Sequence, residues 1–255
     1  MIEFETSYSF SMIPYTTYGS LDDYAEKLIR DFAPHALEAP CELDADGFLE
    51  FYLRLAVSYR HLCVGNNILG ITAFNNGTVE VLDEQSGQSE KIPVEKGTVI
   101  INPSLLAKRN IPRLRFTMLH EGSHWLLHKQ AFAEDNPFGP AGKYENQYIA
   151  AKEGRFDYSR STKEDTDIAR MERQADFLAS AILMNRPALR IAFKEFFKTY
   201  DEKPRRIIRG ASAMDDCFAK LLPEYVAKIF GVSKRAALIR LEKLTGIVDK
   251  GWRTI

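Results

Sequence analysis

The spacing of apolar side chains changes along the chain, and it predicts different elements in different parts. Apolar residues recur at helical intervals over residues 20–32 and about 47–59, which predicts two helices near the N-terminus. Residues 69–74, 78–82 and 97–101 are instead short runs rich in β-branched side chains and separated by turn signals. These runs predict a small antiparallel sheet in the middle of the chain.

Two connecting stretches around this sheet carry further expectations. Residues 75–77, Asn-Asn-Gly, are a candidate hairpin turn between the first two strands. An edge of the sheet could bind an extended peptide by strand addition, and a plain structural hairpin is an equally good interpretation. Residues 131–166 are long and mixed in composition, and we expect them to form a loop that borders a cleft.

The C-terminal quarter contains two more helical patterns, over residues 217–230 and 234–244. Between them stand a glycine and a serine that suit a tight turn followed by a helix cap, which is typical of a helix-turn-helix. A DNA-reading role needs basic and amide side chains early in the second helix, and only Lys234 and Arg235 qualify. We therefore expect structural packing or docking of a repressor, with direct DNA binding as the less favoured alternative.

Composition narrows the functional class. The chain of 255 residues is 45% hydrophobic and 27% charged, which is typical of a soluble globular protein. No apolar run approaches about 18 residues, so no membrane span is expected, and the acidic N-terminus does not resemble a secretory signal. Three scattered cysteines, Cys41, Cys63 and Cys217, are expected to be free thiols in a reducing cytoplasm. A net charge of −1 gives no general attraction to nucleic acid or membranes.

The strongest chemical signal is His120-Glu121-Gly122-Ser123-His124, an H-E-x-x-H pattern inside an apolar run. On a helix, two histidines four residues apart lie on one face, with about 6 Å of rise between them. Both imidazoles can therefore reach one zinc ion. Glu121 lies about 100° around the helix, where it can take a proton from the water that zinc would bind. The alternative is a core helix with two histidines and a glutamate on its wetter side.

A zinc hydrolase normally has a third protein ligand. His128 lies about 12 Å along the helix from His120, too far for one tetrahedral ion, so we expect a helix-end or packing role. The longer histidine motif needs a third histidine where this chain has Gln130. Glu172 stands in a helical pattern and shares a face with Asp176. We predict that Glu172 binds the metal and Asp176 fixes a histidine tautomer; an ordinary surface acidic pair is the alternative.

Taken together, these motifs resemble those of the ImmA/IrrE metallopeptidases. The resemblance covers roughly residues 68–248 and departs from the usual family pattern at Gly122-Ser123, Asp176 and Asn185. The residues that carry it are Gly97-Thr98-Val99-Ile100-Ile101, Arg115-Phe116-Thr117, His120-Glu121, His124, Leu127, Glu172, Ala175-Asp176, Ala179, Leu183-Met184 and Phe230-Gly231-Val232-Ser233. It implies a zinc-dependent endopeptidase with one zinc per chain and Glu121 as general base. Its targets would be regulatory proteins, often phage-type or mobile-element repressors of the helix-turn-helix class.

The expected fold is α+β, with three parts. Residues 1–66 would be an N-terminal helical segment on the core, 67–200 a zincin-like metallopeptidase lobe with the small antiparallel sheet, and 201–255 a helix-turn-helix-like module. Two other functions remain open: a transcriptional regulator or toxin–antitoxin component in which the zinc site is structural or vestigial, and a non-catalytic binding module that uses the sheet edge.

Overall fold

The computed structural model describes residues 2–62, 68–83, 86–137, 148–152, 166–244 and 246–249. It is a mixture of helices and small sheets, so the expected α+β class is confirmed. The described helices are α1 (Tyr18–Phe32), α2 (His35–Glu38), α3 (Ala45–Gly47), α4 (Ile111–His128), α5 (Asp167–Leu183), α6 (Arg186–Lys198), α7 (Ala213–Phe230) and α8 (Lys234–Lys243), with a π-helical turn η1 (Phe48–Tyr52) and 3-10 turns η2 (Pro103–Leu106) and η3 (Lys108–Asn110).

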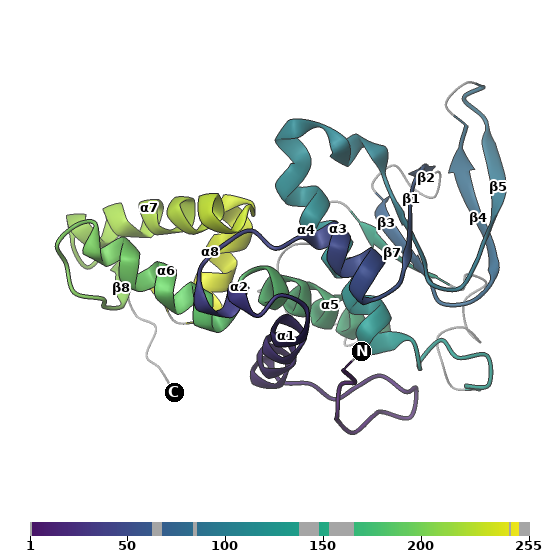
Figure 1. Cartoon of the computed structure of the whole chain (residues 1–255), viewed down its shortest axis with the longest axis horizontal. Helices are drawn as coiled ribbons and strands as arrows, with labels where there is room; N and C mark the ends of the chain where they lie inside the picture. Colours follow the sequence, from purple (N-terminus) through teal and green to yellow (C-terminus); the bar gives the residue numbers. More distant parts are fainter. Residues whose placement is uncertain are drawn as a thin grey trace.

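The strands form two main sheets at one end of the molecule, opposite α6, α7 and α8 (Figure 1). The described strands are β1 (Ala56–Tyr59), β2 (His61–Leu62), β3 (Ile68–Ala73), β4 (Gly77–Leu82), β5 (Ser89–Val94), β6 (Thr98–Ile101), β7 (Tyr148–Lys152), β8 (Ile207–Arg209) and β9 (Ile247–Asp249). One sheet has the order β1-β6-β3-β7 and a second has the order β2-β4-β5, while β8 and β9 form a short parallel pair.

The three predicted strands exist, but they do not form one antiparallel sheet. β3 and β4 lie in different sheets among the described residues, so the turn at 75–77 does not close a hairpin between them. Asn75 is buried and donates a hydrogen bond to the backbone oxygen of Phe132, which ties this turn to the segment after α4. β4 pairs instead with β5 along its whole length, and β1 pairs with β6 in parallel.

Two further expectations about local structure were wrong. The helix expected over residues 47–59 ends early, because Arg54 has a φ of 58° and the chain leaves helical geometry there. Residues 56–59 then form β1. The stretch expected to be a loop after residue 131 contains β7. This strand pairs antiparallel with β3 and forms one edge of the four-stranded sheet. Long-range pairing overrides local propensity at both places.

Helix α4 lies at the centre of the fold and is buried on nearly every side. It packs against α5 and against β3 and β6 of the four-stranded sheet. Gly122 permits a close approach, since a Cβ there would stand 3.2 Å from side-chain atoms of Leu49 and Leu53. A helix surrounded in this way can present polar side chains to the interior, where their positions are fixed by packing. None of the helices in the described ranges is long and apolar enough to cross a membrane.

The C-terminal helices join the same hydrophobic core. One cluster of buried side chains draws members from all three expected parts, including Leu28, Leu119 and Leu222. Helices α7 and α8 pack together across Gly231, which ends α7 with a φ of 60°, and the side chain of Ser233 caps α8. The glycine turn and the serine cap therefore lie where the sequence predicts them, while the boundaries of the three parts stay a prediction.

Candidate metal centre

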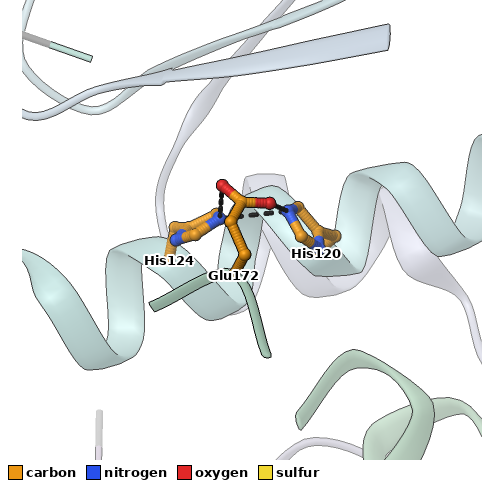
Figure 2. Close-up of side chains that lie close together, drawn as sticks. All are labelled: His120, His124 and Glu172. Carbon is orange, nitrogen blue, oxygen red and sulfur yellow. Dashed lines mark hydrogen bonds and ion pairs between the residues drawn. The ribbon is translucent and has the colours of Figure 1, made fainter. Parts of the chain in front are cut away.

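Helices α4 and α5 bring His120, His124 and Glu172 to one point (Figure 2). The Nε2 atoms of the two histidines are 3.0 Å apart, and each lies 3.5 Å from an oxygen of the Glu172 carboxylate. Among the described residues, these three form a group whose ligand atoms all lie within 4.8 Å of one another. The geometry follows from the four-residue spacing on α4 and from a partner helix that packs closely against it.

Small side chains make this approach of the two helices possible. Ala175 and Ala179 on α5 are fully buried, and they follow Glu172 at the intervals that keep residues on one helical face. The side chain of Thr166 caps the start of α5 by accepting a hydrogen bond from the amide of Ala169. The cap lies six residues before Glu172, so the turn that carries Glu172 is well inside a continuous helix.

Asp176 lies beside His120, as the sequence predicts. Its Oδ1 is 2.8 Å from Nδ1 of His120, and both side chains are buried. An ionised carboxylate can only accept a hydrogen bond, so Nδ1 carries the hydrogen. In the neutral imidazole, Nε2 then has a lone pair that faces Glu172 and His124. A carboxylate partner of this kind orients a ligand histidine and raises its basicity.

The electrostatics of the three side chains reflect this crowding. Burial alone would lower the pKa of His120, but the carboxylates of Asp176 and Glu172 outweigh it and hold the pKa well above its usual value. Burial lowers the pKa of His124, and the attraction of Glu172 offsets only part of that shift. Burial would raise the pKa of Glu172, but its contacts with His120 and His124 hold it below the usual range. Glu172 is therefore ionised at neutral pH.

Glu121 has no exposed surface and lies against β3 rather than among the three converging ligand atoms. Thr72 donates a 2.6 Å hydrogen bond to its Oε2. Gly70, two residues earlier, leaves the space that the carboxylate occupies, since a Cβ there would stand 2.7 Å from Oε1. Sequence reasoning missed both residues, although a lone glycine inside a strand is a signal of close approach.

His128 is not a member of the converging group, as expected from its distance along α4. It is not merely a helix-end residue either. Its Nδ1 lies 3.0 Å from Nδ1 of His124, and its Nε2 lies 2.9 Å from Oε1 of Gln174 on α5. Burial, followed by the neighbouring His124, holds the pKa of His128 well below its usual value. The four-residue spacing from His124 is the signal that could have shown this contact.

Cys41 and Cys217 are free thiols, and Cys63 lies outside the described residues. Most of the expected cleft-bordering loop, residues 138–147 and 153–165, also lies outside them.

Part of the chain matches a known family model. Residues 148–242 match the family model Peptidase_M78, which is described as the IrrE N-terminal-like domain. The chain is similar to the ImmA/IrrE family. This match confirms the resemblance that the motifs predict, and it includes α5 with Glu172 and Asp176 as well as α6, α7 and most of α8. The histidines on α4 come before the matched part. A comparison with curated proteins found no match.

Proposed function

We propose that this chain is a zinc-dependent endopeptidase with a zincin-like core and one zinc ion held by His120, His124 and Glu172. The convergence of their three ligand groups within 4.8 Å is the observation that carries the proposal. Two imidazole nitrogens and a carboxylate oxygen are a donor set found in catalytic zinc sites, which keep a further position open. The similarity of residues 148–242 to a peptidase family supports the same chemistry.

The donor set also fits a cation on physical grounds. The Glu172 carboxylate is ionised and offers only acceptor lone pairs, and Asp176 directs a lone pair of neutral His120 to the same point. Acceptors that face one another in a buried site repel unless a positive charge stands between them. A proton on His120 meets this need in the metal-free protein, and a divalent ion meets it for all three groups at once. Bound zinc would supply Lewis acidity, lowering the pKa of a water toward about 7 and polarising the peptide carbonyl.

Glu121 is the proposed general base. It would accept a proton from the attacking water and later return that proton to the leaving amine. Thr72 holds one carboxylate oxygen of Glu121, and the rigid strand β3 carries Thr72, so the rotation of the carboxylate is fixed before substrate binds. Asp176 has a separate task, since it keeps the ring of His120 in one orientation. Each of these residues lies on α4, α5 or β3 rather than on a loop.

We further propose that the substrate is a regulatory protein, namely a helix-turn-helix repressor of the phage or mobile-element type. This part rests on the family resemblance alone. The α7–α8 unit is the proposed helix-turn-helix-like module, and its favoured role is packing or docking of the repressor. Lys234 forms an ion pair with Glu224 on α7, so one of the two basic residues needed for DNA reading already has a partner. This contact does not favour the alternative of a DNA-binding regulator.

The test compares Glu121→Gln with wild type on two readouts, zinc content and cleavage of a helix-turn-helix repressor of the proposed class. Gln keeps the size of the side chain but cannot accept the proton, so we expect full zinc content and no detectable product. Glu134→Gln is the matched control, because Glu134 is exposed after the end of α4, and it should cleave like wild type. Cleavage by Glu121→Gln at the wild-type rate would contradict the mechanism. Persistent cleavage by wild type in excess chelator would contradict the metal dependence.

A further inference from the structure

A chain of hydrogen bonds leads away from His124 toward the N-terminal segment. His124 contacts His128 through the two Nδ1 atoms at 3.0 Å, and His128 contacts Oε1 of Gln174 at 2.9 Å. The amide nitrogen of Gln174 in turn lies 2.8 Å from the backbone oxygen of Pro14 and 3.1 Å from Oγ1 of Thr16. His124 and His128 have no exposed surface, and Gln174 is buried as well. Water therefore does not compete for the contacts of His128 with His124 and Gln174.

The contact of Gln174 with Pro14 determines which atom is the donor in each hydrogen bond of this series. The carbonyl of Pro14 can only accept, so the amide nitrogen of Gln174 faces it and the amide oxygen faces His128. Nε2 of His128 must then donate to that oxygen. A neutral imidazole has one donor and one acceptor nitrogen, so Nδ1 of His128 accepts from His124. His124 consequently carries its hydrogen on Nδ1, and Nε2 keeps a lone pair that points at His120 and Glu172.

We propose that His128 and Gln174 are positioning residues that hold His124 in the tautomer required of a metal ligand. The carbonyl of Pro14 sets the direction of their hydrogen bonds. The inference deepens the proposed metal site and rests on it. His120 obtains the same tautomer in one step from the charged Asp176, whereas His124 obtains it through two neutral side chains. The N-terminal segment around Pro14 and Thr16 is thereby coupled to the metal centre, although it contributes no ligand.

The first readout is zinc affinity, measured by competition with a chromophoric chelator. Outer partners of ligand histidines typically contribute ~10–100-fold in metal affinity. His128→Leu removes the acceptor for His124, so we expect a loss in this range. His128→Gln keeps an amide oxygen that can accept the hydrogen from Nδ1, so it should recover most of the affinity. Gln130→Leu is the matched control, because Gln130 is exposed in the turn after α4, and it should bind zinc like wild type.

The second readout is the tautomer itself, from nitrogen NMR of the histidine rings at neutral pH. In the zinc-free wild type, we expect the ring hydrogen of His124 on Nδ1 and that of His128 on Nε2. Gln174→Leu should leave the His128 tautomer mixed and lower zinc affinity, whereas a merely structural role would lower thermal stability with no change in tautomer. Replacement of Gln174 also tests the inference if His128→Leu does not fold.

The outcomes separate the two proposals. Failure of wild type to bind zinc would overturn the proposed function. The NMR of the zinc-free protein would still test whether His128 and Gln174 fix the tautomer of His124. A His124 hydrogen on Nε2, or wild-type zinc affinity in both His128→Leu and Gln174→Leu, would overturn the proposed positioning role of His128 and Gln174.

Discussion

Helix α4 carries two buried polar clusters, and they differ in how donors and acceptors are arranged around the α4 side chain. Arg115 is buried and donates to backbone oxygens of Leu43, Phe230 and Gly231. Five residues later, His120 is also buried, and three acceptors surround its ring: the carboxylates of Asp176 and Glu172 and Nε2 of His124. The Arg115 cluster pairs each acceptor with a donor, whereas acceptors outnumber donors in the candidate metal centre. Burial of a polar group is common to both, so the direction of donors and acceptors is the informative property.

The Arg115 cluster has a structural task that is visible in its partners. Leu43, Arg115 and Phe230 come from the three different parts that the sequence predicts, and the guanidinium joins them. It binds the carbonyl oxygens at the end of α7, where a helix leaves such groups without partners. Glu42, whose side chain is largely exposed, adds an ion pair at 3.5 Å. This cluster fixes the C-terminal helices on α4, and the candidate metal centre lies beyond it along the same helix.

The largest expected effect is the loss of a metal ligand. His124→Ala and Glu172→Gln should each lower zinc affinity by more than the ~100-fold typical of an outer partner. Both variants should stay folded, because the remaining core is unchanged. Zinc content after dialysis, measured by atomic emission, is the readout. Glu42→Gln is the matched control at the Arg115 cluster and should keep all of its zinc. Equal zinc loss in Glu42→Gln would erase the distinction between the two clusters.

The next effect is on stability and concerns Arg115. Arg115→Met leaves the carbonyls of Leu43, Phe230 and Gly231 without their charged donor. Hydrogen bonds to charged groups contribute ~1.5–3 kcal/mol each, and the losses are not additive, so we expect the free energy of unfolding to fall by about 3 kcal/mol. Urea unfolding checks this value. The folded protein should still contain one zinc per chain. Zinc loss with unchanged stability would reverse the assigned roles of the clusters.

A smaller effect is expected at Gly231, which contacts the same guanidinium. Its φ is 60°, and a Cβ there would stand 1.9 Å from Nη1 of Arg115, so Gly231→Ala must displace the arginine. A strained backbone position costs ~1–3 kcal/mol, and we expect about 2 kcal/mol in urea unfolding. The double variant with Arg115→Met should be less destabilised than the sum of the two changes, because the steric conflict is then gone. Strict additivity would contradict the contact.

The smallest effect is expected at Thr72, which donates a hydrogen bond to Glu121 beside the candidate metal centre. Thr72→Val removes the hydroxyl that binds Glu121 while keeping the shape of the side chain. A net contribution of ~1.4 kcal/mol corresponds to about a tenfold fall in kcat, with zinc content unchanged. Thr78→Val, at an exposed position of β4, is the control and should keep the wild-type kcat. A wild-type kcat for Thr72→Val in steady-state cleavage would show that Glu121 needs no such support.

The sequence predicts features that depend on local spacing. The four-residue intervals on α4 and α5, the serine cap of α8 and the glycine that ends α7 are all visible without coordinates. The residues that these elements contact are harder to predict from the sequence, because they come from remote parts of the chain. Pairing of β3 with β7, the reach of Thr72 to Glu121 and the contact of Gln174 with Pro14 each join residues separated by dozens of positions. No periodicity encodes such pairings.

Residues 47–59 show that local spacing can also predict the wrong element. Their apolar spacing suits a helix, but residues 56–59 pair with β6, and this parallel pairing contributes more than helical propensity. The candidate ligands could be predicted from the sequence because the chemistry of zinc requires a particular residue type at a particular spacing.

The most direct test of the proposed zinc site is a crystal of the zinc-loaded full chain, measured on both sides of the zinc absorption edge. We expect one anomalous difference peak per chain, bounded by Nε2 of His120, Nε2 of His124 and the carboxylate of Glu172. A strong peak elsewhere, with these three side chains still directed at one another and no ion between them, would contradict it.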